Sequence, residues 1–200
     1  MGLTAKRVVD VGLAGFVLAV TAPIWLVLGC AVLLTMGRPV LFRQQRAGRD
    51  ARPIRVVKFR TMSAEVDATG ALLPDGDRLT RVGRWLRRTS LDELPQFLSV
   101  LSGDMSLVGP RPLPMAYVDR YSPRQRRRLE VDPGLTGWAQ VNGRNSVSWP
   151  ERLELDVWYV EHRSLWLDLC IMVRTVGVVV SGSGVSADGE ATMAEFTGTE

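Results

Sequence analysis

The sequence predicts an α+β fold that is mainly helical, with an N-terminal re-entrant membrane helix, a small β-hairpin and interfacial amphipathic helices. Three observations lead to this fold class: an apolar stretch at residues 8–36, two β-rich runs at 40–42 and 54–62, and later segments with helical patterns. Those segments are 82–88, 91–101, one starting at 122, 149–161 and 165–180. We therefore expect two parts, a re-entrant helix–break–helix at 1–38 and a cytoplasmic, membrane-associated domain at 39–200.

The apolar stretch at 8–36 contains Asp10 as its one charged residue and exceeds the roughly 20 residues that span a bilayer. It is too long for the apolar part of a cleavable signal peptide. A simple transmembrane helix would explain the composition, but Pro23 lies near the middle, where it removes a backbone hydrogen bond and favours a kink. A segment that enters one leaflet and returns accommodates the proline, with Thr21 as a candidate to bond a freed backbone group. Basic residues on both flanks also place both ends in the cytoplasm by the positive-inside rule; they are Lys6, Arg7, Arg38, Arg43, Arg46, Arg49, Arg52 and Arg55.

Composition limits the classes of partner. With 46% apolar and 23% charged residues, the chain is typical of globular rather than disordered proteins. A formal charge of +4 and a pI near 9.6 suit an anionic partner, but charge alone does not distinguish nucleic acid, acidic lipid and phosphorylated substrate. Cys30 and Cys170 show no metal or redox spacing, and Walker, dinucleotide-binding, zinc and haem motifs are absent. His162, the single histidine, is expected at a helix end or on the surface rather than in acid–base catalysis.

Lysine is rare in this chain. Among 25 basic residues, Lys6 and Lys58 are the only lysines. Because arginine and lysine differ in shape and hydration, these two positions either reflect chance or need an ammonium group.

Two adjacent carboxylates, Asp92 and Glu93, stand in the segment Ser90-Leu91-Asp92-Glu93-Leu94-Pro95. One interpretation is structural, since Ser-x-x-Glu before an apolar run is a helix capping box. Pro95 weakens that interpretation, because it could itself be the first residue of the helix. Asp92 and Glu93 would then lie just before that helix. In either case they lie at the positive end of a helix dipole, where the ionised form that a nucleophile or metal ligand requires is favoured.

Other polar residues suit phosphate chemistry. In Pro110-Arg111-Pro112, two prolines stiffen the backbone around a guanidinium that fits phosphate, although a rigid surface turn would have the same sequence. Lys58 lies near a basic cluster that includes Arg87, and this group could hold a diphosphate or face acidic lipid. Asp156 and Asp168 lie in helical segments, and Asp168 in an apolar one needs a metal or a cation as partner. The Gly- and Asn-rich segment 133–145 could bring backbone amides close to a ligand, with Trp138 as a stacking surface.

Together, these residues resemble the monotopic phosphoglycosyl transferases of the bacterial sugar transferase family, in particular the small single-domain members. The resemblance covers nearly the whole chain in order. It rests on Lys6-Arg7-x-x-Asp10, Lys58-Phe59-Arg60-Thr61-Met62, Ser90 to Gln96, Gly103 to Pro112, Pro133 to Arg144 and Asp156-Val157-Trp158-Tyr159-Val160. Ala22-Pro23 occupies the place of the family's small residue–Pro helix break, where some members have serine before the proline.

The resemblance implies a reaction and a site. A sugar-1-phosphate would pass from a UDP-sugar to a polyprenyl (undecaprenyl) phosphate with release of UMP, through a covalent intermediate on Asp92. Glu93 would bind Mg²⁺, and the matching substrate-binding positions are Lys58, Arg87, Pro110, Arg111, Pro112, Asp156 and Asp168. The expected partners are the UDP-sugar, the prenyl phosphate and membrane lipid at the cytoplasmic face of the bacterial inner membrane, and not nucleic acid.

A non-enzymatic basic module that tethers the chain to anionic membranes is the alternative function. It accounts for the arginines and the apolar helices. It gives no reason for Asp92, Glu93 and Asp168.

Overall fold

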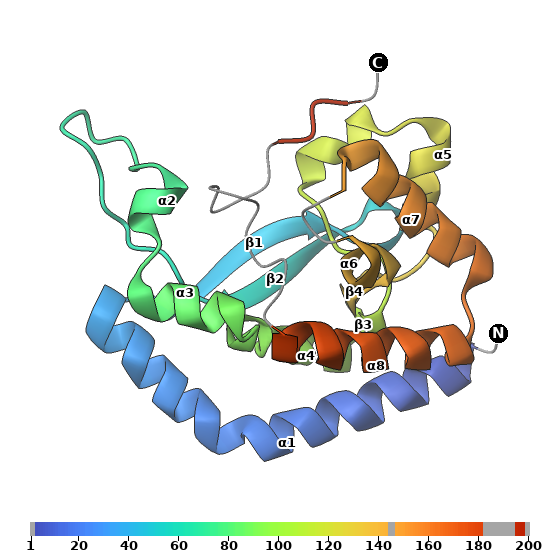
Figure 1. Cartoon of the computed structure of the whole chain (residues 1–200), viewed down its shortest axis with the longest axis horizontal. Helices are drawn as coiled ribbons and strands as arrows, with labels where there is room; N and C mark the ends of the chain where they lie inside the picture. The colour runs from blue at the N-terminus through green and yellow to red at the C-terminus, as the bar shows by residue number, and fades with distance from the viewer. Residues whose placement is uncertain (1–2, 144–146, 182–194, 199–200) are drawn as a thin grey trace.

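The structure, a computed structural model, describes residues 3–143, 147–181 and 195–198. It confirms a mainly helical α+β fold, in which helices surround two small two-stranded sheets, β1–β2 and β3–β4. Figure 1 shows α1 as a long helix beneath the rest of the chain, with α3, α4 and α8 forming the layer next to it.

The predicted β-hairpin is confirmed. Strand β1 (Leu41–Ala47) pairs antiparallel with β2 (Pro53–Phe59), from Leu41 opposite Phe59 to Ala47 opposite Pro53. A short 3-10 turn, η1 (Arg49–Ala51), lies in the connection. Strand β1 runs further than the β-rich residues 40–42, because pairing with β2 keeps its polar second half extended.

The predicted helix at 82–88 is α3 (Arg81–Arg88), and Thr80 caps it by accepting a hydrogen bond from the Gly83 amide. It follows the single turn α2 (Asp75–Arg78). The segment predicted as one helix over 91–101 contains two elements, the 3-10 turn η2 (Leu91–Glu93) and α4 (Gln96–Ser102). Gly103, with φ 94°, ends α4 in the left-handed conformation that suits glycine.

The segment 133–145, predicted as a loop, contains a strand and a helix. Strand β3 (Ser106–Val108) pairs parallel with β4 (Gly134–Thr136), and α6 (Trp138–Asn142) follows. Gly134 has a packing role, since a Cβ there would lie 2.1 Å from the Gly109 amide nitrogen. That this segment brings backbone amides close to a ligand stays a prediction, and residues 144 and 145 lie outside the described residues. Trp138 stacks on Trp158 rather than standing free.

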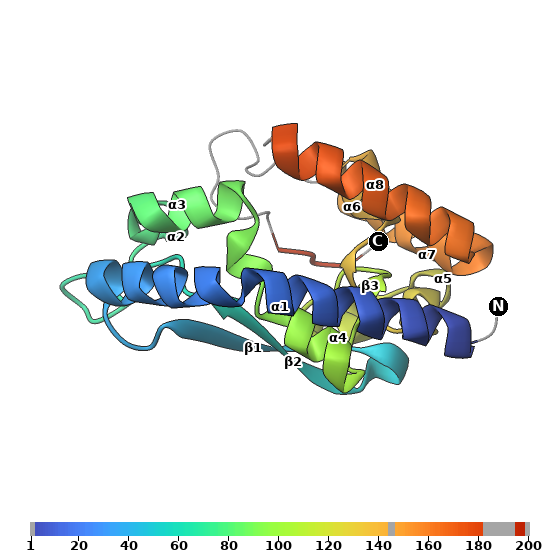
Figure 2. The same cartoon turned by 90° about the horizontal axis from the view of Figure 1, so that it is seen from below.

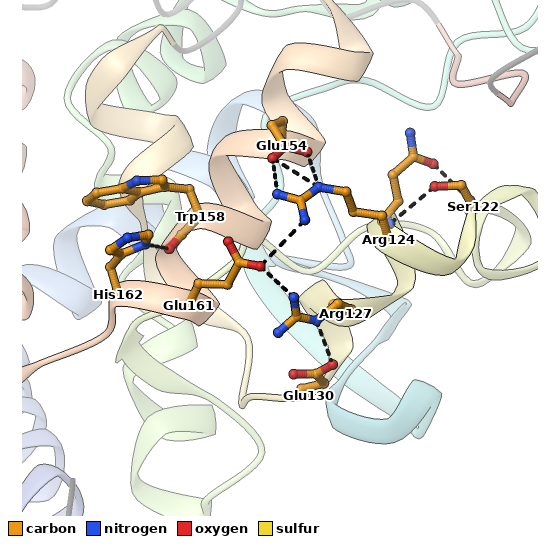
Figure 3. A network of polar contacts seen from close by, with 9 residues as sticks. Ser122, Arg124, Arg127, Glu130, Glu154, Trp158, Glu161 and His162 are labelled. Atoms are coloured by element: carbon orange, nitrogen blue, oxygen red, sulfur yellow. Dashed lines mark hydrogen bonds and ion pairs between the residues drawn. The ribbon is translucent and has the colours of Figure 1, made fainter.

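Ion pairs join α5 (Pro123–Arg126) and the 3-10 turn η4 (Arg127–Leu129) to the outer face of α7 (Trp149–His162). Figure 3 shows Arg124 between Glu154 and Glu161, and Arg127 between Glu161 and Glu130. A further 3-10 segment, η3 (Met115–Arg120), precedes α5, and both α5 and α7 begin with a capping box.

His162 lies in the last turn of α7, exposed and stacked on Trp158, which confirms its predicted place at a helix end.

Helix α1 (Leu3–Met36) runs through Pro23 without interruption, and Figure 1 shows it bent near its middle. The predicted helix–break–helix is therefore a continuous bent helix, since a proline removes one hydrogen bond and crowds the carbonyl four residues earlier. The Thr21 hydroxyl donates to the Val17 carbonyl (2.7 Å), not to the Ala19 carbonyl that loses its usual partner. Such hydroxyl bonds to the preceding turn also bend helices.

Both halves of α1 pack against the rest of the chain on the same side. Near the N-terminal end, Arg7 donates to the Val100 and Leu101 carbonyls of α4. In the C-terminal half, Leu28 and Val32 pack in a core cluster with β2, α3 and the segment after η2, through Phe59, Leu86 and Leu94. In Figure 2, α1 crosses the molecule between the β-hairpin on one side and α3 and α8 on the other.

Apolar side chains also cover the outward side of α1. The stretch Ala5–Met36 is long and apolar enough to cross a membrane, yet only 11% of its most apolar window is buried in the protein, unlike a soluble core helix. Helix α8 (Leu165–Ser181) is similar: among its described side chains, five large apolar ones are exposed, namely Leu165, Trp166, Leu169, Val173 and Val176. Exposed apolar surface of this kind is typical of proteins that associate with a membrane or with another protein.

Gly83 is required where α3 crosses the end of the hairpin. A Cβ added there would lie 1.8 Å from the Thr61 carbonyl oxygen, whereas one on Gly76 in α2 would meet nothing within 4 Å. We expect Gly83→Ala to lower the free energy of unfolding by about 1–3 kcal/mol, the usual cost of overpacking. Thermal unfolding of the detergent-solubilised protein would measure it. Gly76→Ala is the matched control and should leave the midpoint unchanged or raise it, and equal midpoints for the two variants would contradict the packing argument.

Candidate active site

Asp92 and Glu93 lie in η2, between α3 and α4. The Ser90 side chain caps no amide and its φ is 56°, so the capping box is not formed. Pro95 directly precedes the first residue of α4, which leaves both carboxylates in the approach to that helix. Asp92 is 7% exposed. A buried carboxylate without a capping role is a candidate for chemistry.

Glu93 is held by two cations from distant parts of the chain. Its Oε1 accepts a hydrogen bond from Lys58 Nζ at the end of β2 and another, 2.6 Å long, from Arg111 Nη2 after β3. The predicted residues Lys58, Glu93 and Arg111 are therefore in direct contact, and Pro110 and Pro112 flank the arginine in the chain. One of the two lysines of the chain is thus paired with the acidic dyad.

The two carboxylates have opposite pKa shifts. Burial alone would raise the pKa of Glu93, but the charges of Arg111 and Lys58 and their hydrogen bonds bring it well below its usual range. Burial and the neighbouring Glu93 charge raise the pKa of Asp92 to about 6, although Lys58, Arg87 and Arg111 act in the opposite direction. Two neighbouring carboxylates that differ in this way are suited to different roles, one as a fixed charge and the other as a reactive group.

Arg87 approaches the dyad from α3. Its Nε donates to the Thr61 hydroxyl (3.0 Å). This hydrogen bond fixes the Arg87 side chain close to the place where Gly83 of α3 packs against the Thr61 backbone. Burial lowers the pKa of Arg87, while the Asp92 charge raises it. The positive charge of Arg87, one of the predicted substrate-binding residues, therefore acts on the Asp92 carboxylate.

Asp156 acts on the site through another residue. On α7, it forms a fully buried ion pair with Arg128 (2.8 Å), and Arg128 Nη2 also donates to the backbone carbonyl of Arg111 (2.6 Å). This hydrogen bond holds the backbone of the Pro110–Pro112 segment against η4. Sequence reasoning missed Arg128, because nothing in the arginine run of the helix predicted to start at 122 distinguishes the one buried arginine from its more exposed neighbours.

Asp168 lies in a different cluster. Its carboxylate accepts from Lys6 Nζ (2.6 Å) and from the Tyr159 hydroxyl (2.7 Å), and Asp10 accepts from Ser106 nearby (2.7 Å). The partner expected for this carboxylate is therefore a cation, and it joins the start of α1 to α8. The structure does not bring Asp168 into contact with Asp92 or Glu93 among the contacts of the described residues.

The donor set of the dyad fits a magnesium ion. No group of three His, Cys, Asp or Glu side chains that could hold a metal occurs among the residues that the structure describes. Mg²⁺ needs no such group, since it commonly binds through one or two carboxylates, substrate phosphates and water. Glu93 and Asp92 supply two adjacent carboxylates with basic residues around them that would hold the phosphates.

Comparisons with known proteins show which family this sequence matches. The family model for bacterial sugar transferases matches residues 1–182. An uncharacterized sugar transferase, EpsL, of Bacillus subtilis (strain 168) is 50% identical over 194 residues, which are 97% of this chain and 96% of the relative.

Two relatives carry the name UDP-glucose:undecaprenyl-phosphate glucose-1-phosphate transferase. That of Caulobacter vibrioides is 45% identical over 181 residues, 86% of this chain and 68% of the relative. That of Escherichia coli (strain K12) is 43% identical over 183 residues, and the chain covers 39% of its length. The match of the family model over residues 1–182 and the near full-length similarity to EpsL show that this chain belongs to the bacterial sugar transferase family.

Proposed function

We propose that this chain transfers a sugar-1-phosphate from a UDP-sugar to undecaprenyl phosphate, with release of UMP. The observation that carries the proposal is the buried Asp92 beside a Glu93 that Lys58 and Arg111 hold in its charged form. The names of the Caulobacter and E. coli relatives support the substrates. A membrane-tethering module would need no such dyad.

The reaction would proceed in two displacements. An oxygen of the Asp92 carboxylate attacks the β-phosphorus of the UDP-sugar, the bond to the bridging oxygen breaks, and UMP leaves with the electron pair. An oxygen of the prenyl phosphate then attacks the same phosphorus, and the Asp92 carboxylate leaves. A covalent intermediate of this kind divides one difficult transfer into two easier steps.

The surrounding residues would bind and orient the phosphates. Lys58, Arg87 and Arg111 direct positive charge at Asp92, which stabilises the charge that develops in phosphoryl transfer. Arg128 and Asp156 keep the Arg111 backbone in place. Mg²⁺ held by Glu93 and the diphosphate would neutralise charge on the departing UMP.

We also propose that α1 enters the membrane from the cytoplasmic face of the inner membrane and returns to it. Contacts of both ends of α1 with the same domain, by Lys6 and Arg7 at one end and Leu28 and Val32 at the other, support this topology. A straight spanning helix would separate one end from the domain by the thickness of the bilayer.

Topology is testable by cysteine labelling. In a variant whose Cys30 and Cys170 are replaced by alanine, single cysteines at Ala5 and Arg49 should react with a membrane-impermeant maleimide from the same side of sealed vesicles. Both positions are exposed. Labelling from opposite sides would show a spanning helix.

The covalent intermediate is testable by intact-protein mass spectrometry. With a UDP-sugar and Mg²⁺ but no acceptor, the wild type should gain the mass of one sugar phosphate and release UMP. Asp92→Asn keeps the shape and removes the nucleophilic charge, so it should gain nothing. The Arg124→Gln variant, on the outer face of α5, is the control that should label normally. A wild type that turns over without ever carrying an adduct would show that Asp92 is not the nucleophile.

The raised pKa of Asp92 predicts an acid limit to the reaction. Asp92 attacks only when ionised, and its pKa is about 6 rather than the ordinary value of 3.8, so kcat/KM for the UDP-sugar should fall about tenfold per unit below that pH. Lys58 opposes this rise, so Lys58→Gln should move the inflection to higher pH as well as lower the rate. A profile that stays flat from pH 8 to 5 would contradict the assignment.

A further inference from the structure

The last described segment of the chain, residues 195–198, docks into the domain that carries the site, and the proposed reaction gives no reason for it. Phe196 in this segment is 2% exposed. Its ring centroid lies 5.6 Å from those of Tyr117 and Trp149 and 5.9 Å from that of Tyr121. We call these three rings the aromatic socket. Figure 1 shows the segment in red beside the start of α7, on the side of the molecule away from α1.

Polar contacts hold the backbone of this segment as well as its buried ring. The Phe196 amide donates to the Tyr117 hydroxyl (3.1 Å). Arg120 Nη1 donates to the Phe196 carbonyl and to the Glu195 carboxylate (2.7 Å), and both Arg120 and Tyr117 belong to η3. The ends of most domains are poorly ordered unless such contacts tie them down. The segment therefore has a specific docking place on the domain.

The aromatic socket is in contact with the residue that holds the Arg111 backbone. The Tyr121 hydroxyl accepts a hydrogen bond from Arg128 Nη1 (3.3 Å), and the Arg128 guanidinium lies 5.6 Å from the centre of the Tyr121 ring. Arg128 Nη2 donates in turn to the Arg111 carbonyl (2.6 Å). A path from Phe196 to Arg111 thus runs through two side chains, each in contact with the next.

Packing provides a second path to the same part of the chain. Leu113, two residues after Arg111, belongs to the core cluster that contains Phe196. The Leu113 carbonyl also accepts a hydrogen bond from the amide of Ala47 (2.8 Å), another member of that cluster, at the end of β1. Because protein cores are close-packed, removal of a buried ring leaves a void and the residues around it lose contacts. The Phe196 ring therefore limits the movement of the chain that follows Arg111.

We propose that Phe196 is a positioning residue for the transfer reaction and that it acts through Arg111. Docked in the aromatic socket, Phe196 keeps Tyr121 against Arg128, and Arg128 keeps the Arg111 backbone in place. This inference rests on the proposed function, in which Arg111 binds phosphate. A misplacement of about 1 Å in a group that orients the substrate can cost about 100-fold in rate. The C-terminal segment thus contributes to the rate without contact with the substrate.

Rates of UMP release test the inference in the detergent-solubilised full chain, supplied with a UDP-sugar, Mg²⁺ and undecaprenyl phosphate. Phe196→Ala empties the socket and should lower kcat/KM for the UDP-sugar at least about tenfold, and Phe196→Leu, which keeps apolar volume there, should lower it less. Tyr121→Phe keeps the ring and removes only the hydroxyl that contacts Arg128, so it should also lower kcat/KM, even if Phe196→Ala fails to fold. Thr197→Ala changes an exposed neighbour in the same segment and is the matched control, with folding verified by circular dichroism.

A double-mutant cycle separates positioning from a general loss of stability. If Phe196 acts through Arg111, Phe196→Ala should lower kcat/KM much less in an Arg111→Lys background than in the wild type, because the group that it positions is already lost. Tyr121→Phe should show the same non-additivity. A purely structural loss would multiply with that of Arg111→Lys, so equal fold-losses in the two backgrounds would overturn the inference.

The remaining outcomes separate this inference from the proposed function. If the wild type releases UMP and folded Phe196→Ala and Tyr121→Phe release it at the same rate, the inference is overturned and the proposed function stands. If these variants change only the KM for prenyl phosphate, the segment acts on the acceptor, and the inference is overturned as well. A wild type that releases no UMP from any UDP-sugar would refute the proposed function itself.

Discussion

Glu93 joins three distant segments of the chain, because its Oε1 accepts hydrogen bonds from Lys58 at the end of the hairpin and from Arg111 after β3. The arrangement of the site depends on this contact. A buried carboxylate is stable only when cations and hydrogen bonds replace its hydration. Each of the three charged groups can therefore be removed from water only when the hairpin, η2 and the Pro110–Pro112 segment pack together. Removal of either cation would leave the Glu93 charge with one partner in place of two.

A second buried ion pair supports the first. Asp156 and Arg128, whose side chains are 3% and 1% exposed, lie behind the Arg111 backbone, and Arg128 donates to the Arg111 carbonyl. The glycine contacts between β3 and β4 fix the other end of this segment, since Gly134 donates to the Pro110 carbonyl (3.0 Å). Arg111 is thus held at its side chain, at its carbonyl and at the neighbouring residue. Such support keeps the Arg111 guanidinium in one orientation, as the proposed phosphate binding would require.

Contacts at both ends of α1 join this apolar helix to the rest of the chain. Lys6 pairs with Asp168 and connects the start of α1 to α8, while Leu28 and Val32 pack with Leu94 beside the dyad. The bend at Pro23 lets both halves of α1 reach one domain while their outer sides remain apolar and exposed. Under the proposed function, a lipid acceptor would therefore approach Asp92 from the α1 side.

The sequence by itself determined the elements and the chemical groups. The length of the apolar run, Pro23, the two β-rich runs and the helical periodicities are local signals, and they predicted α1, the hairpin, α3, α7 and α8 because each depends on nearby residues. The pair Asp92-Glu93 and the Pro110-Arg111-Pro112 motif were visible for the same reason. Local sequence did not predict β4 and α6, because Gly134 is in a strand only through its pairing with Ser106 on β3. It also could not assign Asp156 and Asp168, both acidic residues on helices, to their clusters. Tertiary structure decided that Asp156 pairs with Arg128 behind Arg111 and that Asp168 pairs with Lys6 of α1, since a buried charge takes its partner from whichever distant segment packs against it.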